Sequence, residues 1–195
     1  MIAVVIGSGI VVDVAQRPIL AYGLAGCRPA AQLASRLWSA APQRCIDPAK
    51  EYSAEVQTTK GAFTIRLSAH DAPVTVNNFI VLAQQGYFTG LHFFESKDWE
   101  IRSGDPTNTG HGGPGYSLPA EPVAGGEKWL AGSVGMARVP EGGLSGGQFF
   151  ITRTVWPGGN PSISYNHFGM VQAGFDNLAQ LSSSDRILGV EVIQQ

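Results

Sequence analysis

Alternating apolar and polar residues mark the first two strands of the chain. Every second side chain from Tyr52 to Thr58 suits a buried face, and the same alternation returns from Phe63 to Leu67. A period of two is that of a β-strand with one face turned inward. The Lys60–Gly61 pair separates the two runs, so the pattern predicts a β-hairpin.

A helical spacing follows in the stretch "APVTVNNFIVLAQQG". Its apolar positions recur at the intervals of one helical face, at Val76, Phe79, Ile80 and Ala83. Pro73 suits the first turn of a helix, and Gly86 suits the residue just past its end. The pattern predicts a helix between these two residues and a second, brief helix in "FDNLAQL", residues 175–181.

The remaining pattern consists of short apolar segments separated by glycine-rich turns. These segments are "WLAGSVGMA", "GQFFITRT", "HFGMVQAG" and, near the end of the chain, "RILGVEVI". Many short strands combined with two helices favour a mainly-β fold, in which the helices plug a closed barrel.

Residues 1–48 lack this pattern and are interpreted as a leader and linker of uncertain role, ahead of a domain over residues 49–195. The apolar run "MIAVVIGSGIVV" is too short to span a bilayer, and "RPAAQLASRLWSAA" is compatible with one helical stretch. "LAGC", Leu24–Cys27, resembles the lipobox of bacterial lipoproteins. Because the apolar run ahead of this motif is so short, we expect a cytoplasmic protein. A membrane anchor through Cys27 is the alternative.

Composition narrows the classes of partner. The 195 residues carry a formal net charge of −2, and their Lys and Arg are scattered, which argues against nucleic acid. The two cysteines fall outside the predicted domain, and neither they nor the four histidines have the spacing of a metal site. "GHGGPG", residues 110–115, has the residue spacing of a dinucleotide-binding motif. No helix is predicted after it, so we interpret it as a loop and not as a dinucleotide site. We expect neither a metal nor a cofactor.

The segment "LSGGQFFIT", residues 144–152, carries the most information about a site. Phe149 and Phe150 are neighbours on a predicted strand, so their side chains must face opposite sides. We expect one to fill the barrel and the other to line an outer pocket; an ordinary strand with a buried Phe pair is the alternative.

The order of these motifs resembles that of the cyclophilins, a family of peptidyl-prolyl cis–trans isomerases. The likeness extends from about Tyr52 to Ile193 and includes "APVTVNNFIVLAQQGYFTG", "SGDPTNTGHGGPGY", "GSVGMA", "SGGQFFIT" and "HFGMV". It implies an eight-stranded antiparallel barrel of the compact bacterial kind, with a helix at each end and a substrate groove outside. It also implies cofactor-free isomerase activity on proline-containing peptides or unfolded proteins, by a monomer.

The resemblance assigns substrate contacts residue by residue. Phe150 and Trp99 match aromatic residues of the family's proline pocket, and Gln148 matches a glutamine that hydrogen-bonds the substrate backbone. Ala137 matches the small residue that receives the side chain before proline.

Two further positions belong to the rim of the implied groove. Arg138 replaces an asparagine whose backbone contacts the substrate, and Tyr165 falls near the usual histidine of the pocket rim. Trp156 has no clear equivalent in the family pattern.

Three positions depart from that pattern. Counting back without gaps from "GDP", residues 104–106, the usual catalytic arginine becomes Phe94, the usual glutamine becomes Arg102 and the usual methionine becomes Glu100. Phe94 cannot supply a cation, so it is left as part of the substrate wall. Any catalysis is expected to depend on Arg102 with Gln148, and Glu100 would either orient or neutralise Arg102.

These residues are compatible with three functions. The first is a prolyl isomerase, weakened by the lack of an arginine at position 94. The second is an inactive cyclophilin-like module that binds proline-containing peptides. The third is a structural barrel whose groove is filled by the bulk of Phe94 and Trp99.

Overall fold

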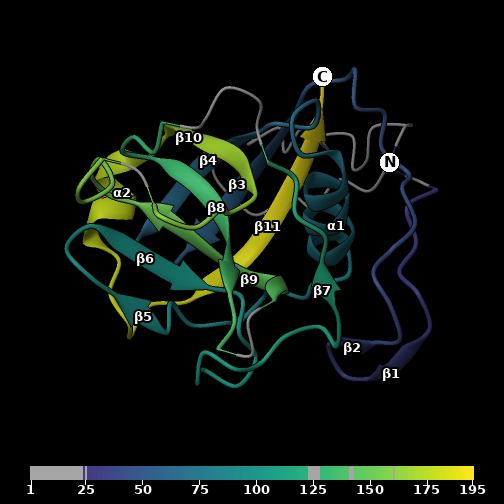
Figure 1. The fold of residues 1–195 in the computed structure, drawn as a ribbon. Helices are drawn as coiled ribbons and strands as arrows, with labels where there is room; N and C mark the ends of the chain where they lie inside the picture. The colour runs from purple at the N-terminus through teal and green to yellow at the C-terminus, as the bar shows by residue number, and fades with distance from the viewer. Residues whose placement is uncertain (1–23, 25, 123–127, 141–142, 160) are drawn as a thin grey trace, which may run out of the picture.

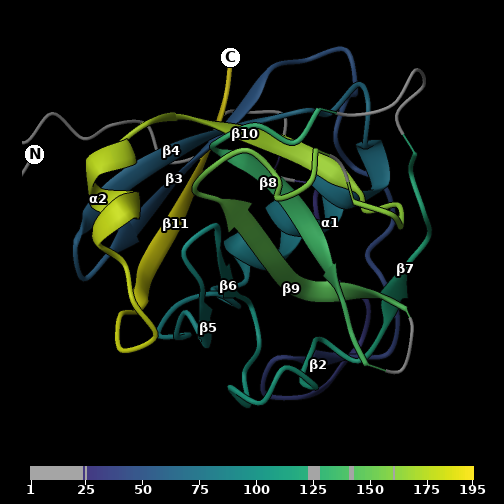
Figure 2. The same cartoon turned by 60° about the vertical axis from the view of Figure 1, so that its left-hand side comes forward.

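The structure is a computed structural model, and it describes residues 24, 26–122, 128–140, 143–159 and 161–195. The apolar run at residues 1–12 therefore lies outside the described residues. A curled antiparallel sheet forms most of the molecule, with a helix at each end of the sheet (Figures 1 and 2). In chain order, the elements are β1 (Gln32–Ala34), β2 (Leu37–Trp38), β3 (Tyr52–Thr58), β4 (Gly61–Leu67), α1 (Pro73–Gln84), β5 (Glu95–Ser96), β6 (Glu100–Ser103), β7 (Ser117–Leu118), β8 (Ser133–Arg138), β9 (Leu144–Thr152), β10 (His167–Ala173), α2 (Phe175–Gln180) and β11 (Ile187–Gln194).

The strand order of the main sheet is β11-β3-β4-β10-β8-β9-β6-β5, and β7 pairs with β9 beside this path. The hairpin predicted from the alternating pattern is β3–β4, with Thr58 opposite Gly61 at its turn. The strands predicted at residues 144–152 and at the end of the chain are β9 and β11. The mainly-β character of the fold is therefore confirmed.

The sheet is curled but open. β11 and β5 are its outermost strands, and the described residues contain no ladder that joins them. A bridge between His92 and Arg186 brings the chain before β5 beside the start of β11. β5 has only two residues, so it offers too few backbone groups for a ladder. The closed barrel predicted from the sequence is wrong: the main path is an open half-barrel of eight strands.

Both predicted helices are present. α1 starts at Pro73, as expected, and packs its apolar face into the sheet: the ring centroid of Phe79 lies 4.9 Å from Phe88, 5.8 Å from Phe149 and 5.3 Å from Phe168. α2 covers the other end of the sheet, beside β4 (Figure 2).

The two phenylalanines of β9 face opposite sides, as the alternation predicts. Phe149 belongs to the main hydrophobic core under α1, whereas Phe150 belongs to a separate small cluster on the outer side of the sheet. The outer cluster marks the face on which a binding site is expected.

Residues 32–38 form a hairpin of their own, β1–β2, which packs beside the glycine-rich loop after β6 (Figure 1). A helix across this stretch was compatible with the sequence but is not formed, because Arg36 turns the chain with a φ of 57°, in the left-handed region. Trp38 is 3% exposed and joins the main core together with Leu24, Cys27 and Ile46. Part of the predicted leader is therefore packed against the domain.

A disulfide joins Cys27 to Cys45. Both cysteines were expected to lie outside the folded part, but Cys27 is buried and the bond closes the segment that carries β1 and β2. No helix in the described part of the chain has the length and apolar character that spanning a bilayer requires.

Candidate functional site

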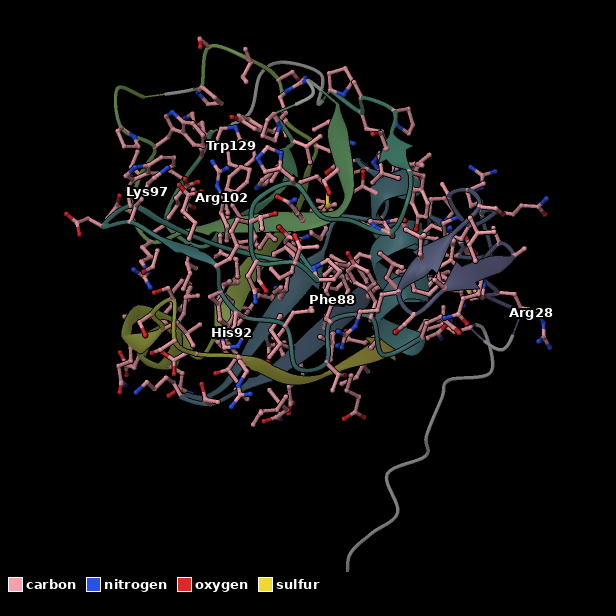
Figure 3. All side chains as sticks on the ribbon, turned by 90° about the horizontal axis from the view of Figure 1, so that it is seen from below. Arg28, Phe88, His92, Lys97, Arg102 and Trp129 are labelled. Carbon is pink, nitrogen blue, oxygen red and sulfur yellow. A yellow bond between two sulfur atoms is a disulfide. The ribbon has the colours of Figure 1, made fainter. Side chains whose placement is uncertain are left out.

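The outer face of the sheet brings together side chains from four neighbouring strands. Arg102 on β6 is opposite Phe150 on β9, Phe150 is opposite Gly135 on β8, and Gly135 is opposite His167 on β10. Directly opposite residues share one face of a sheet, so these positions define one surface. Figure 3 shows Arg102 and Trp129 together on this side of the molecule, far from Arg28.

An aromatic cluster covers Phe150. Trp129 stacks on the Phe150 ring with centroids 5.2 Å apart, Tyr165 meets it edge-on at 5.2 Å, and Trp156 does so at 5.9 Å. Trp99 extends the cluster by contacting Trp156 at 4.7 Å. Phe150 is 0% exposed as a result. A proline ring can reach Phe150 only if one of the covering rings moves.

The stack of Trp129 on Phe150 depends on the absence of a side chain at Gly135. A Cβ at Gly135 would lie 2.5 Å from the Trp129 ring and 2.6 Å from the Phe150 ring, closer than real Cβ contacts. His167 packs against the other side of Trp129, with ring centroids 4.9 Å apart. Burial lowers the pKa of His167, which favours a neutral imidazole there.

Two carboxylates hold the Arg102 guanidinium. Nε lies 3.1 Å from Oε2 of Glu95, and Nη2 lies 3.0 Å from Oε1 of Glu100. Glu100 is fully buried and lies on the same side of β6 as Arg102, as the alternation predicts. Nη1 has no hydrogen-bond partner among the described residues, so it can donate to a bound molecule.

Lys97 completes this charged group. Its Nζ lies 2.6 Å from Oε1 of Glu95 and 3.1 Å from Oε1 of Glu100. The hydrogen bond to Glu95 raises the pKa of Lys97, although burial opposes the shift. Two cations and two carboxylates therefore alternate at this edge, and their formal charges cancel.

Arg102 lies over the aromatic cluster. Its guanidinium carbon is 6.0 Å from the centroid of Phe150. Burial raises the pKa of the nearby Tyr165 hydroxyl, and the Arg102 charge opposes that shift. A cation therefore stands beside the aromatic cluster although position 94 has no arginine.

Gln148 is buried and hydrogen-bonds to the glycine-rich loop. Its Nε2 donates to the carbonyls of Gly110 at 2.9 Å and Gly112 at 2.7 Å. Both hydrogens of the amide are therefore used within the protein, which leaves Oε1 as the atom to meet a substrate. Phe94 is half-buried beside the same loop, with a ring carbon 3.9 Å from where a Cβ of Gly110 would be.

The remaining predicted contacts lie along β8. Ala137 is 0% exposed and belongs to the outer cluster with Phe150 and Trp129. The Arg138 side chain donates through Nη2 to the carbonyl of Ser164 at 2.9 Å, beside Tyr165. β8 and the segment just before β10 thus bring these predicted residues to one side of the aromatic cluster.

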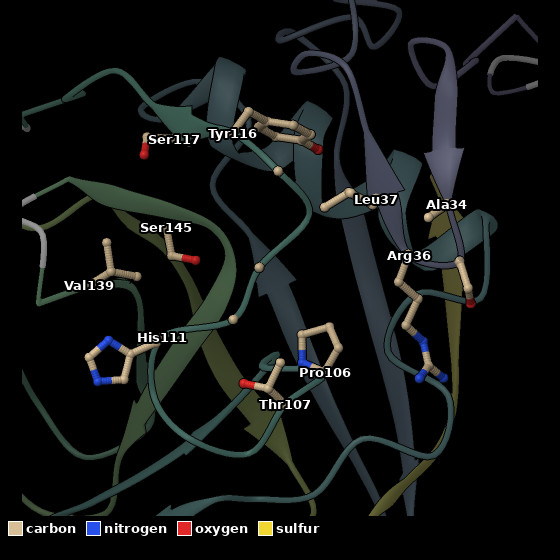
Figure 4. Close-up of a pocket in the computed structure, with 14 residues that line it drawn as sticks. Ala34, Arg36, Leu37, Pro106, Thr107, His111, Tyr116, Ser117, Val139 and Ser145 are labelled. Atoms are coloured by element: carbon tan, nitrogen blue, oxygen red, sulfur yellow. The ribbon is translucent and has the colours of Figure 1, made fainter.

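A separate cavity of about 570 Å³ lies beside this surface (Figure 4). Its walls are the β1–β2 hairpin at residues 34–37, the loop over residues 106–117, and the side chains of Val139 and Ser145. It is separated from the aromatic cluster along β9 by the four residues between Ser145 and Phe150. No residue of this cavity was predicted as part of a site.

Similarity to known proteins identifies the family. A family model described as cyclophilin type peptidyl-prolyl cis-trans isomerase/CLD matches residues 53–193. This chain belongs to the cyclophilin family. Its relatives are named peptidyl-prolyl cis-trans isomerases, so it is a member of an enzyme family of isomerases.

Sequence relatives and solved structures agree on this cyclophilin. The chain is 33% identical over 141 residues to a peptidyl-prolyl cis-trans isomerase of Synechococcus elongatus, covering 71% of this chain and 94% of that protein. It is 36% identical over 104 residues to one of Helicobacter pylori, covering 53% and 63%. A crystal structure of a Cryptosporidium parvum cyclophilin type peptidyl-prolyl cis-trans isomerase has a TM-score of 0.64 at 26% identity, covering 74% of this chain and 99% of that chain. A structure of the Cryptosporidium protein in the presence of the dipeptide Ala-Pro has a TM-score of 0.63 at 26% identity, covering 73% and 99%.

Sequence reasoning missed part of this surface. Trp129 was not recognised, and Trp156 was left unassigned, because both lie just outside the regular strands. Glycine at position 135, in the middle of a strand, was the available signal that a large ring lies over that strand. Glu95 and Lys97 were not predicted as partners of Arg102.

Proposed function

We propose that this cyclophilin isomerises X-Pro bonds in peptides and unfolded proteins, with Arg102 as the catalytic cation. The observation that carries the proposal is the place of its guanidinium, 6.0 Å from the centroid of Phe150 and held there by Glu95 and Glu100.

The chemistry needs no nucleophile. The barrier to rotation about a peptide bond, roughly 18–20 kcal/mol, comes from conjugation between nitrogen and carbonyl. Twisting the X-Pro bond breaks this conjugation, and the prolyl nitrogen regains a lone pair that can accept a hydrogen bond. A positioned cationic donor stabilises the twisted state more than the planar one, which lowers the barrier.

Each part of the site has a role in this mechanism. The Nη1 group of Arg102 donates to the prolyl nitrogen in the twisted state. Phe150 and Trp99 pack against the proline ring once the aromatic cluster has opened, and Oε1 of Gln148 accepts from the substrate backbone. These packing and backbone contacts are made in both planar and twisted states, so they affect affinity more than turnover.

The test is a proline-isomerisation assay on wild type, Arg102→Gln and Phe94→Arg, with peptide affinity measured alongside. We expect Arg102→Gln to lower turnover by roughly tenfold or more, which is about 1.4 kcal/mol, with a smaller change in affinity. Phe94→Arg should raise turnover. Arg28→Gln is the matched control, since Arg28 is exposed and lies far from the site (Figure 3).

Activity that survives Arg102→Gln unchanged would sink the assignment of Arg102. The second candidate function is a non-catalytic module for proline-containing peptides. It is favoured by the ion pairs of Arg102 with Glu95 and Glu100, because the two carboxylates offset the charge that catalysis would need. Peptide binding without detectable turnover in wild type, unaffected by Arg102→Gln, would support that candidate instead.

We also propose that the protein works in an oxidising compartment, although the sequence favoured the cytoplasm. The Cys27–Cys45 disulfide supports this, because such bonds persist outside the reducing cytosol. A sulfur engaged in a disulfide also cannot carry a lipid thioether, so the two states of Cys27 exclude each other. Alkylation of thiols in freshly lysed cells should leave both cysteines unmodified; labelling of both, or acyl chains on Cys27, would refute the proposal.

A further inference from the structure

The segment between the two cysteines contacts both backbone stretches that hold the proposed catalytic residues. We call residues 27–45 the brace; it contains β1 and β2 and is closed by the Cys27–Cys45 disulfide. The family match begins at residue 53, so the brace lies outside it. What it does for the site must therefore be read from its own contacts.

The first set of contacts reaches the glycine-rich loop. The backbone N–H of Trp38 donates to the carbonyl of Pro114 at 2.8 Å. The carbonyl of Trp38 lies 2.7 Å from where a Cβ of Gly115 would be, so the two chains are packed without space for a side chain. The Gly110 and Gly112 carbonyls of this loop accept the two hydrogen bonds from Gln148. The brace therefore supports the loop that orients Gln148.

The second set of contacts reaches the end of β6. The buried ring of Trp38 lies 5.8 Å from the ring of Tyr87, and the Tyr87 hydroxyl donates to the carbonyl of Gly104 at 2.9 Å. Gly104 follows Arg102 by two residues. Its backbone also presses on β9, because a Cβ there would lie 2.0 Å from the carbonyl oxygen of Gly147. Through Tyr87, Trp38 thus supports the strand end that carries Arg102.

Little besides the disulfide holds the brace together internally. β1 has three residues and β2 has two, and a two-stranded hairpin of this length is not stable alone. Besides the contacts of Trp38, its attachments include hydrogen bonds from Arg36 to the carbonyl of Thr89, from the Cys45 N–H to Oδ1 of Asn77 at 2.8 Å, and from Nδ2 of Asn77 to the carbonyl of Gln43 at 3.1 Å. Opening the disulfide would therefore leave Trp38 held by noncovalent contacts, among them those to Tyr87 and Pro114, and would loosen the brace around it.

We propose that the brace is a positioning element of the isomerase site, locked by the Cys27–Cys45 disulfide and loosened by its reduction. In the reducing step, a thiolate of a dithiol attacks one sulfur and forms a mixed disulfide. The second thiolate of the reductant then displaces the protein sulfur. Two electrons and two protons convert the disulfide into two cysteine thiols, and the dithiol becomes a disulfide.

This proposal rests on the proposed function and predicts how the kinetic constants separate. The brace does not contact Phe150 or Trp99, so peptide packing is retained when the brace is loose. The backbone around Arg102 and Gln148 loses its support. We expect kcat to fall roughly tenfold on reduction, within the range that small misplacements of catalytic groups cost, while KM changes little.

The experiment compares oxidised protein, protein reduced with dithiothreitol and then reoxidised, and the Cys27→Ser/Cys45→Ser double variant. Isomerase kinetics are measured together with amide hydrogen exchange. Exchange should accelerate at residues 104–116 in the reduced and double-variant proteins, stay slow in β3 and β4, and recover on reoxidation. Trp38→Ala should reproduce the change, Trp38→Phe should largely restore protection and kcat, and Leu33→Ala, at a side chain 64% exposed on the same hairpin, should have no effect.

The outcomes separate the two proposals. Unchanged exchange at residues 104–116 on reduction overturns the brace, whether or not the enzyme is active. Equal acceleration in β3 and β4 also overturns it, because the disulfide would then stabilise the fold as a whole. An inactive oxidised wild type overturns the proposed isomerase alone, and a local, reversible change in exchange would still support the brace.

Discussion

The carboxylate of Asp105 is fully buried beneath the loop that faces Gln148. Oδ1 accepts from the N–H and hydroxyl of Thr107 at 2.7 and 2.8 Å, and Oδ2 accepts from the N–H groups of Thr109 at 3.0 Å and Gly110 at 2.6 Å. Burial alone would raise the pKa of Asp105, but these hydrogen bonds lower it below the ordinary value of 3.8. The folded state therefore holds the ionised form.

Replacing Asp105 by Asn should remove a pH-dependent part of the stability. The pKa of Asp105 is lower in the folded state than the value of about 3.8 in the unfolded state. The stabilisation from the ionised carboxylate is therefore complete above pH 3.8 and is lost as the pH falls through the folded-state pKa. At pH 7 the variant should be less stable by about 1–3 kcal/mol, the usual cost of unsatisfied buried groups. The difference from wild type should shrink below pH 4, near that unfolded value of 3.8.

Urea unfolding of both proteins at pH 7 and pH 3 measures this effect. Asp98→Asn, at an exposed carboxylate, is the control. A difference that is the same at both pH values would show that the charge of Asp105 has no part in it.

At the residue scale, the sequence predicts to which side of a strand each side chain points, but not which residues meet across a loop. The alternation on β6 placed Glu100 and Arg102 on one side, and their hydrogen bond confirms it. The partners of Asp105 were not foreseen, because a turn that folds back on its own carboxylate leaves no periodic signal. The cover over Phe150 was missed for the same reason, since Trp156 comes from an irregular segment.

At the element scale, α1 has an unusual N-terminus. Its N-cap position is Ala72, which has no side chain to accept the free N–H groups. Glu121 does this from a distant loop: Oε1 accepts from the N–H of Val74 at 2.8 Å, and Oε2 accepts from the N–H of Thr75 at 2.8 Å. A carboxylate at this end also interacts favourably with the helix dipole.

Glu121→Ala should therefore lower the free energy of unfolding by about 1–2 kcal/mol, as removal of a helix cap does. Thermal unfolding measures the loss, and Glu191→Ala on the exposed side of β11 is the control. Equal stability of the two variants would show that water replaces Glu121 at no cost.

The elements divide clearly into those that local sequence specifies and those that it does not. β3, β4 and α1 were predicted correctly because the apolar residues of each recur at the spacing of a strand or a helix, and each has a turn residue at its end. The β1–β2 hairpin was not, since its structure depends on one residue with positive φ and on the burial of Trp38 against distant parts of the chain. A helix was compatible with the sequence there, but tertiary packing decides for the hairpin.

At the scale of the whole molecule, the packing of residues 24–46 bears on where the domain begins. The boundary expected after residue 48 stays a prediction, but a chain starting at Asp47 would lose the buried side chains of Leu24, Trp38 and Ile46. Truncating one buried Trp commonly costs about 3–5 kcal/mol. We therefore expect the chain over residues 47–195 to fold with a clearly lower Tm than full-length protein.

Calorimetry on the two chains decides the matter, with a chain starting at residue 24 as the control. An unchanged Tm for residues 47–195 would restore the interpretation of residues 1–48 as a dispensable leader.

The open sheet could not be predicted from the sequence either. Whether its outermost strands pair depends on the length of β5, which no local pattern specifies.

The aromatic cluster also gives this molecule an optical property. Of the four tryptophans in the chain, Trp99, Trp129 and Trp156 belong to the cluster over Phe150, and Trp38 lies in the core. Three of the four indoles therefore lie at the proposed site, Trp129 buried and Trp99 and Trp156 partly buried. A peptide that displaces one of these rings would shift the emission to longer wavelength. With Trp38 replaced by Phe, every emitting indole would report on the site, and binding could be followed without a label.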